Sequence, residues 1–145
     1  MDRFLALAVE LALARGTRMV EPVALEEAAA ADGIDHDGCV ALLRALRDGG
    51  LLQLALSPSR QVVLVALTDA GVLRWAEEAR PDLVGVRSRL AAAAAAAVGQ
   101  GPVDLAATVG EPPLLVECVL DQWVRERRVV YSKAPGRRFR VHRVS

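Results

Sequence analysis

The sequence is poor in aromatic residues: two tryptophans, two phenylalanines and one tyrosine make up 3% of its 145 residues. Surfaces that hold single-stranded nucleic acid depend on stacking aromatic side chains, so the composition disfavours this class of binding. Cysteine is equally scarce, with Cys39 and Cys118 alone. Two thiols in a chain without a signal-peptide pattern predict a reduced, cytoplasmic protein in which both cysteines are small buried core residues.

The sequence also lacks any run of about 18 or more residues apolar enough to span a bilayer, so we expect no membrane contact. It has no glycine-rich phosphate loop, because Gly99-Gln100-Gly101 lacks a preceding strand and a third glycine. His36 and Cys39 have a His-x-x-Cys spacing, but no second ligand pair lies nearby and zinc normally takes four ligands. We therefore expect no enzyme activity, no catalytic residues, no metal and no cofactor.

Apolar residues are abundant, at 53% of the chain with a mean hydropathy of +0.28. Small domains bury a modest fraction of their surface, so part of this apolar area is expected to meet a partner. A helix predicted over 2–15 is apolar on nearly all sides, which indicates a homodimer or another protein contact. The predicted interface consists of Phe4, Leu5, Val9, Val63 and Val65.

Charge is unevenly distributed, although eighteen basic and eighteen acidic residues give a net charge of zero. Residues 121–145 hold eight Lys or Arg against Asp121 and Glu126, a net of +6, and the rest of the chain carries a net of −6. Such asymmetry predicts a contact with nucleic acid or with an acidic protein at the C-terminal end.

The stretch 35–67 recurs at about 112–144. At a shift of 78 positions Leu42 falls on Leu120, Leu51 on Val129 and Arg60 on Arg138. The residues 22–25 also resemble 102–105 at a shift of 80. The repeat predicts two similar units, 1–80 and 81–145, separated at Arg80-Pro81 because the residue before a proline avoids helical geometry.

Capping residues and apolar spacing predict a mainly α fold with small β-hairpins, in the α+β class. The predicted helices cover 2–15, 22–31, 36–48, 69–79, 82–98, 103–108 and 113–127, and the hairpins cover 51–67 and 129–144. The strand 62–67 is apolar without alternation, which predicts that both its faces are covered. The second hairpin alternates and exposes a cationic face.

Three helices followed by a two-stranded hairpin resemble the winged-helix form of the helix-turn-helix. The segment Leu67-Thr68-Asp69-Ala70-Gly71 is similar to the Leu-Thr-x-x-Gly stretch that closes the wing in many bacterial regulators. The whole chain resembles two such units in tandem, packed together. In DNA-binding members the third helix enters the major groove and the wing touches the backbone or the minor groove. The resemblance therefore implies reading helices at 36–48 and 113–127, and wings at 51–67 and 129–144.

Two functions fit this resemblance. The first is a transcriptional regulator that binds duplex DNA through the basic second wing. Its predicted nucleic-acid contacts are Arg125, Arg128, Lys133, Arg137, Arg138, Arg140 and Arg143. The second is a protein–protein adaptor or complex subunit, similar in architecture to the kleisin-interacting tandem winged-helix subunits of chromosome-organising complexes.

Acidic residues in and before the reading helices favour the adaptor, because carboxylates such as Asp37 and Glu117 would face phosphates. The basic second wing favours the regulator. The arginine cluster is also consistent with a solvated, solubilising surface.

Overall fold

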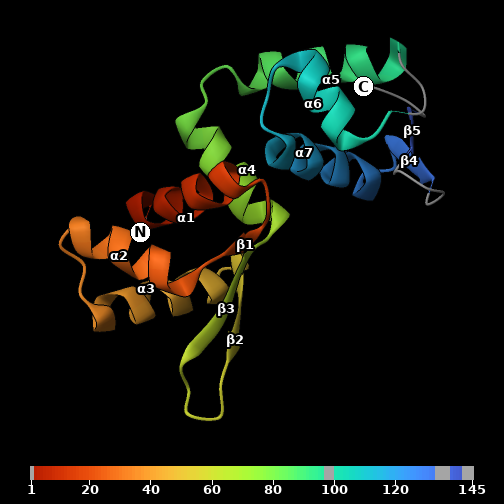
Figure 1. Cartoon of the computed structure of the whole chain (residues 1–145). Helices are drawn as coiled ribbons and strands as arrows, with labels where there is room; N and C mark the ends of the chain where they lie inside the picture. Colours follow the sequence, from red (N-terminus) through yellow and green to blue (C-terminus); the bar gives the residue numbers. More distant parts are fainter. Residues whose placement is uncertain (1, 97–99, 133–137, 142–145) are drawn as a thin grey trace. The chain divides into compact units, whose positions relative to one another are not determined.

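The computed structural model describes residues 2–96, 100–132 and 138–141. The chain is mainly α-helical with small antiparallel β-sheets, a composition compatible with a winged-helix-like α+β fold (Figure 1). It divides into two compact units, Met1–Trp75 and Ala76–Ser145, which we call unit 1 and unit 2. The division falls inside a helix, ahead of the boundary predicted at Arg80-Pro81. Packing of the two units against each other stays a prediction.

Unit 1 begins with α1 (Asp2–Arg15), β1 (Met19–Val20), α2 (Pro22–Ala31) and α3 (His36–Asp48). It continues through β2 (Leu52–Leu56) and β3 (Val62–Leu67) into α4 (Asp69–Ala79). These four helices have the bounds predicted from the sequence. The strands form an antiparallel sheet in the order β1-β3-β2. Strand β1 was not predicted, because two residues are too few to show an alternating pattern.

The local sequence of α3 accounts for its start, its buried stripe and its end. Asp35 caps the helix by accepting a hydrogen bond from the Gly38 N–H at 2.7 Å. Cys39, Leu43 and Leu46 are buried at helical spacing. The chain then leaves the helix through Gly50, whose φ of 75° is open to glycine at little cost. Both cysteines of the chain are free and buried, as predicted.

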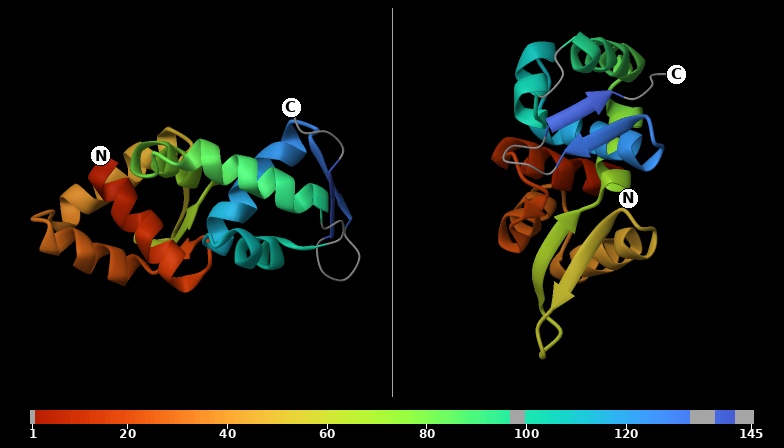
Figure 2. Two further views of the ribbon diagram at one scale, coloured as in Figure 1. Left: turned by 90° about the horizontal axis from the view of Figure 1, so that it is seen from above. Right: turned by 90° about the vertical axis from the view of Figure 1, so that its right-hand side faces the viewer.

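The β2–β3 hairpin is covered over its inner half only. Val65 is fully buried, but Val63 is 57% exposed and the hairpin extends beyond the helices of unit 1 (Figure 2). The prediction that both faces of 62–67 are covered is therefore wrong for the outer half. Strand β1 pairs with Val65 and Ala66 and goes no further, because Pro22 begins α2 and has no N–H for a ladder.

The join between β3 and α4 gives a structural reason for the Leu-Thr-x-x-Gly stretch. Thr68 Oγ1 accepts a hydrogen bond from the Gly71 N–H at 3.1 Å and donates one to the Gly50 carbonyl at 2.8 Å. The Thr68 N–H also donates to the Leu51 carbonyl, against which Gly71 is packed. The join therefore fixes the start of α4 to the turn between α3 and β2.

Unit 2 contains α5 (Leu83–Ala96), α6 (Pro102–Val109), α7 (Pro113–Arg125), β4 (Val129–Ser132) and β5 (Arg138–Val141). Helix α6 contacts α5 and α7, and the strands form an antiparallel hairpin that contacts both α5 and α7. Helix α7 ends at Arg125, two residues earlier than predicted, and Arg127 beyond its C-cap takes a left-handed φ of 59°. Its buried residues are Leu114, Leu115, Val116, Cys118, Val119, Leu120 and Trp123.

None of the helices in the described part of the chain has the length and hydropathy needed to cross a membrane.

Candidate functional site

Of the two predicted reading helices, α3 has the larger exposed surface. We call its exposed side the α3 face. It consists of Asp37, Ala41, Arg44, Ala45, Arg47 and Asp48, all exposed. Arg47 Nη2 lies 3.2 Å from Asp48 Oδ1, so these two charges are paired on the surface. Arg44 makes no ion pair with any described residue, which leaves its guanidinium available for an anion. Helix α7, by contrast, is buried on much of its circumference.

The tip of the unit 1 hairpin carries a second available cation. Arg60 is exposed, has a left-handed φ of 62° and makes no ion pair within the described ranges. The sequence repeat had paired it with Arg138 but did not single it out as a contact. The tip is otherwise neutral and polar, with the Ser57 and Ser59 hydroxyls 2.9 Å apart.

Two of the predicted nucleic-acid contacts lie near the C-terminal end of α7. Arg125 is exposed. The Arg128 guanidinium carbon lies 4.9 Å from the centroid of the Trp123 ring, and its Nη1 lies 3.5 Å from Glu126 Oε2. A stacked and paired guanidinium contributes to the packing of unit 2.

Two more predicted contacts are placed by the backbone of the second hairpin. Arg138 pairs with Ser132 and Arg140 with Val130 in the antiparallel register. Because strand residues alternate between faces, Arg138 and Arg140 belong to the same face of the hairpin. The remaining predicted contacts, Lys133, Arg137 and Arg143, lie outside the described residues.

The predicted partner interface is largely in the core. Phe4, Leu5, Val9 and Val65 are at most 2% exposed, because the chain itself covers them, whereas Val63 is exposed. The exposed large apolar side chains of unit 1 lie instead on its sheet and on α2. These are Met19, Val23, Leu56 and Val63, which we call the exposed apolar residues of unit 1.

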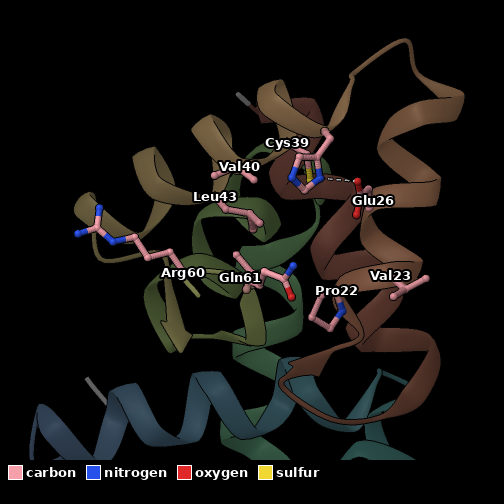
Figure 3. A pocket seen from close by; sticks show the side chains of 10 residues that line it. Pro22, Val23, Glu26, Cys39, Val40, Leu43, Arg60 and Gln61 are labelled. Carbon is pink, nitrogen blue, oxygen red and sulfur yellow. Dashed lines mark hydrogen bonds and ion pairs between the residues drawn. The ribbon is translucent and has the colours of Figure 1, made fainter. Parts of the chain in front are cut away.

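A pocket of about 290 Å³ opens between α2, α3 and the start of β3 (Figure 3). Its apolar lining includes Cys39, Val40 and Leu43 from α3. At its edge His36 Nδ1 lies 2.6 Å from Glu26 Oε1. This hydrogen bond, with the negative charge of Glu26, raises the pKa of His36 above its ordinary value. Burial raises the pKa of the Cys39 thiol, which therefore stays protonated and unreactive at neutral pH.

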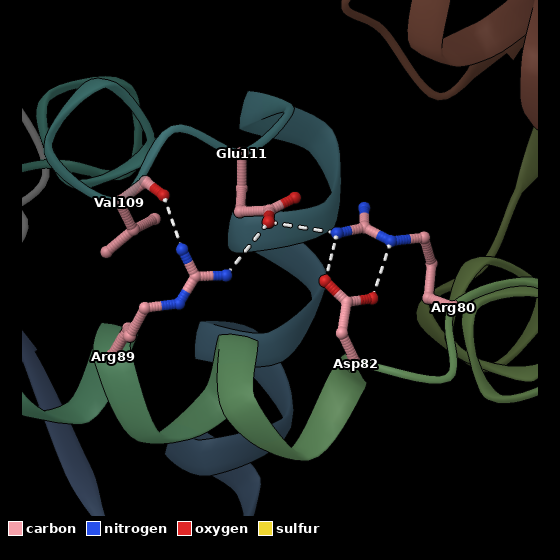
Figure 4. Close-up of polar contacts among 5 residues, drawn as sticks. All are labelled: Arg80, Asp82, Arg89, Val109 and Glu111. Atoms are coloured by element: carbon pink, nitrogen blue, oxygen red, sulfur yellow. Dashed lines mark hydrogen bonds and ion pairs between the residues drawn. The ribbon is translucent and has the colours of Figure 1, made fainter.

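Unit 2 contains a charge network that sequence reasoning missed (Figure 4). Glu111 Oε1 accepts hydrogen bonds from Arg80 at 2.9 Å and from Arg89 at 3.2 Å. Arg80 also binds both carboxylate oxygens of Asp82, each at 3.0 Å. Arg89 further donates to the Val109 carbonyl at 3.2 Å. The network connects the start of α5 to the turn between α6 and α7, so its role is structural.

No group of three or more His, Cys, Asp or Glu side chains in the described part of the chain is arranged to hold a metal. Comparison of the chain with protein-family models gives no match, and comparisons with curated proteins and with solved structures give none either.

Proposed function

We propose that this chain is a tandem winged-helix protein that binds duplex DNA, as a transcriptional regulator, and has no catalytic role. The topology of unit 1 supports this most directly. Its elements run α1-β1-α2-α3-β2-β3, and β1 pairs with β3, which is the order of a winged helix. Unit 2 repeats three helices followed by a hairpin. In this architecture the third helix and the wing are the elements that meet DNA.

The distribution of charge supports the second wing as the main contact. The segment 121–145 has a net charge of +6, and Arg138 and Arg140 share one face of the hairpin. Arginines on a hairpin bind phosphates or a narrow minor groove. Arg44 on the α3 face and Arg60 at the first hairpin tip are available for additional phosphate contacts, because neither is paired among the described residues.

A salt-dependent DNA titration tests the proposal. Each phosphate contact adds about 0.9 to the slope of log affinity against log salt. Replacing Arg137, Arg138 and Arg140 by Ala should flatten this slope by roughly two to three units and weaken binding to all sequences alike.

The matched control removes three exposed arginines elsewhere, Arg3, Arg15 and Arg74, and so changes the net charge equally. It should leave the slope almost unchanged. If the wild-type protein bound no DNA duplex at about 50 mM salt, a role as a DNA-binding transcriptional regulator would be excluded.

The second candidate function is a protein–protein adaptor, and the exposed apolar residues of unit 1 favour it. Met19, Val23 and Val63 are each at least 48% exposed in a unit whose α3 face is mixed in charge. Large exposed apolar side chains are consistent with a protein interface.

Sedimentation equilibrium tests whether Leu56 and Val63, toward the outer end of the hairpin, contact a second copy of the chain. A particle heavier than 15.5 kDa that becomes a single chain in the Leu56→Asp, Val63→Asp double variant would assign these two residues to a homodimer interface. A mass that does not respond to these substitutions would rule that out.

A further inference from the structure

The pocket of unit 1 combines an apolar floor with a negatively charged edge. Val40 and Leu43 from α3 and Val62 from β3 supply aliphatic surface, and Glu26 from α2 supplies a carboxylate. Its volume of about 290 Å³ is near the lower end for small-molecule sites in proteins. A ligand that matches this lining has a compact apolar body and one polar head.

The charge of the head follows from the groups around the edge. Glu26 faces His36 from α2, and the negative charges of Asp35 and Asp37 also raise the pKa of His36 from within the same turn of α3. The hairpin contributes Arg60, whose guanidinium points away from Glu26, and Gln61, whose amide is neutral (Figure 3). The edge beside Glu26 is therefore negative, apart from the His36 ring when it is protonated.

We propose that this pocket binds a small organic cation, with its ammonium group against Glu26 and its apolar body against Val40 and Leu43. His36 is then the internal competitor for Glu26. Its protonated ring forms an ion pair with the Glu26 carboxylate and repels a cation, whereas its neutral ring does neither. Binding of the cation therefore strengthens as the pH rises from the ordinary histidine pKa of 6.5 through the raised pKa of His36. The inference does not depend on DNA binding, since every residue in it belongs to unit 1.

The experiment uses the full chain and three probes of matched shape: cyclohexylammonium, cyclohexanecarboxylate and cyclohexanol. Backbone amide NMR shifts are followed during each titration, which detects weak binding and locates it. The ammonium should shift amides of α2 and α3 saturably, with an affinity that increases as the pH rises from 6.5 through the raised pKa of His36. The carboxylate should bind more weakly and show the opposite pH trend.

Two variants locate the charge and the floor. Glu26→Gln should weaken cyclohexylammonium binding about tenfold, because a charge-assisted hydrogen bond becomes a neutral one. Glu27→Gln is the matched control, since Glu27 is exposed on the same helix and does not line the pocket. Val40→Phe should fill the pocket and abolish binding. Thermal melts of each variant show whether the fold is retained.

Three outcomes overturn the proposal. One is tighter binding of the carboxylate than of the ammonium, which would make His36 or Arg60 the head-group contact. The second is an equal loss of affinity in Glu26→Gln and Glu27→Gln, which would indicate a diffuse attraction to an acidic surface. The third is the absence of saturable shifts with millimolar cyclohexylammonium.

Discussion

Gly71 lies against the backbone carbonyl of Leu51 so closely that a Cβ at this position would overlap the oxygen. The carbonyl belongs to the turn after α3, and the Thr68 N–H donates a hydrogen bond to it. The conformation of Gly71 itself is open to any residue, so the requirement for glycine is one of space. The glycine of the Leu-Thr-x-x-Gly stretch therefore allows the start of α4 to approach the hairpin.

Gly71→Ala is expected to destabilise the protein by about 1–3 kcal/mol, because Leu51 would have to move with its hydrogen bond. Gly85→Ala is the matched control. Gly85 lies in α5 with open space around its Cα, so the same substitution should stabilise by about 0.5–1 kcal/mol through helix propensity. Urea denaturation of both variants measures the change in the free energy of unfolding and its sign. A Gly71→Ala variant as stable as the wild type would mean that the turn after α3 can move at little cost in free energy.

Val63 and Val65 lie in the outer and inner halves of β3, which differ in exposure. Val65 is fully buried, so Val65→Asp would place an unpaired carboxylate in the core and should cost on the order of 3 kcal/mol or more. Val63 is 57% exposed, so Val63→Asp should cost less than about 1 kcal/mol. Thermal melts compare the two variants at one pH and salt concentration. Equal destabilisation would mean that another surface covers Val63.

The helices could be predicted because their signals are local. Asp35 before α3, the apolar spacing within it and Gly49-Gly50 after it lie within one short stretch of sequence. The coverage of each face could not be predicted, because it depends on elements distant in the chain. An all-round apolar α1 indicated a partner, yet the chain itself covers Phe4 and Val9.

The pocket and the charge network were missed for the same reason. Glu26 and His36 are ten positions apart, and Arg80 and Glu111 are 31 apart, so no spacing in the sequence connects them.

The Glu26–His36 pair predicts a pH-dependent contribution to stability. The pKa of His36 is raised in the folded chain, first by its hydrogen bond to Glu26 and then by the charge of that residue. A raised folded pKa means that the contribution is fully present below the unfolded value of 6.5 and is lost as the pH rises through the folded value.

Glu26→Gln should lower the pKa of His36 toward 6.5 and remove this part of the pH dependence. An NMR titration of the His36 ring measures its pKa, and thermal melts at pH values below and above 6.5 measure the pH dependence of stability. Glu27→Gln should change neither, and an unchanged His36 pKa in Glu26→Gln would contradict the assignment.

Glu111 should contribute more to the stability of unit 2 than either arginine that binds it. Its side chain is 7% exposed and accepts two guanidinium hydrogen bonds, so Glu111→Ala leaves Arg80 and Arg89 both short of a partner. The expected cost is about 1–3 kcal/mol. The Arg89 side chain is 53% exposed, so Arg89→Ala should cost no more than about 1 kcal/mol after solvent screening. Arg80→Ala should fall between them, because Arg80 is 24% exposed and also binds Asp82.

Denaturation followed by Trp123 fluorescence, in a Trp75→Phe background, reports this series from within unit 2. Salt should reduce the Arg89 contribution more than that of Arg80, because screening acts mainly on exposed charges. The Glu111 side chain is the least exposed of the three and is shared by both arginines, so the order of the three costs tests the network. If Arg89→Ala and Glu111→Ala lowered the free energy of unfolding equally, the exposed Arg89–Glu111 ion pair would account for the whole network, which contradicts this prediction.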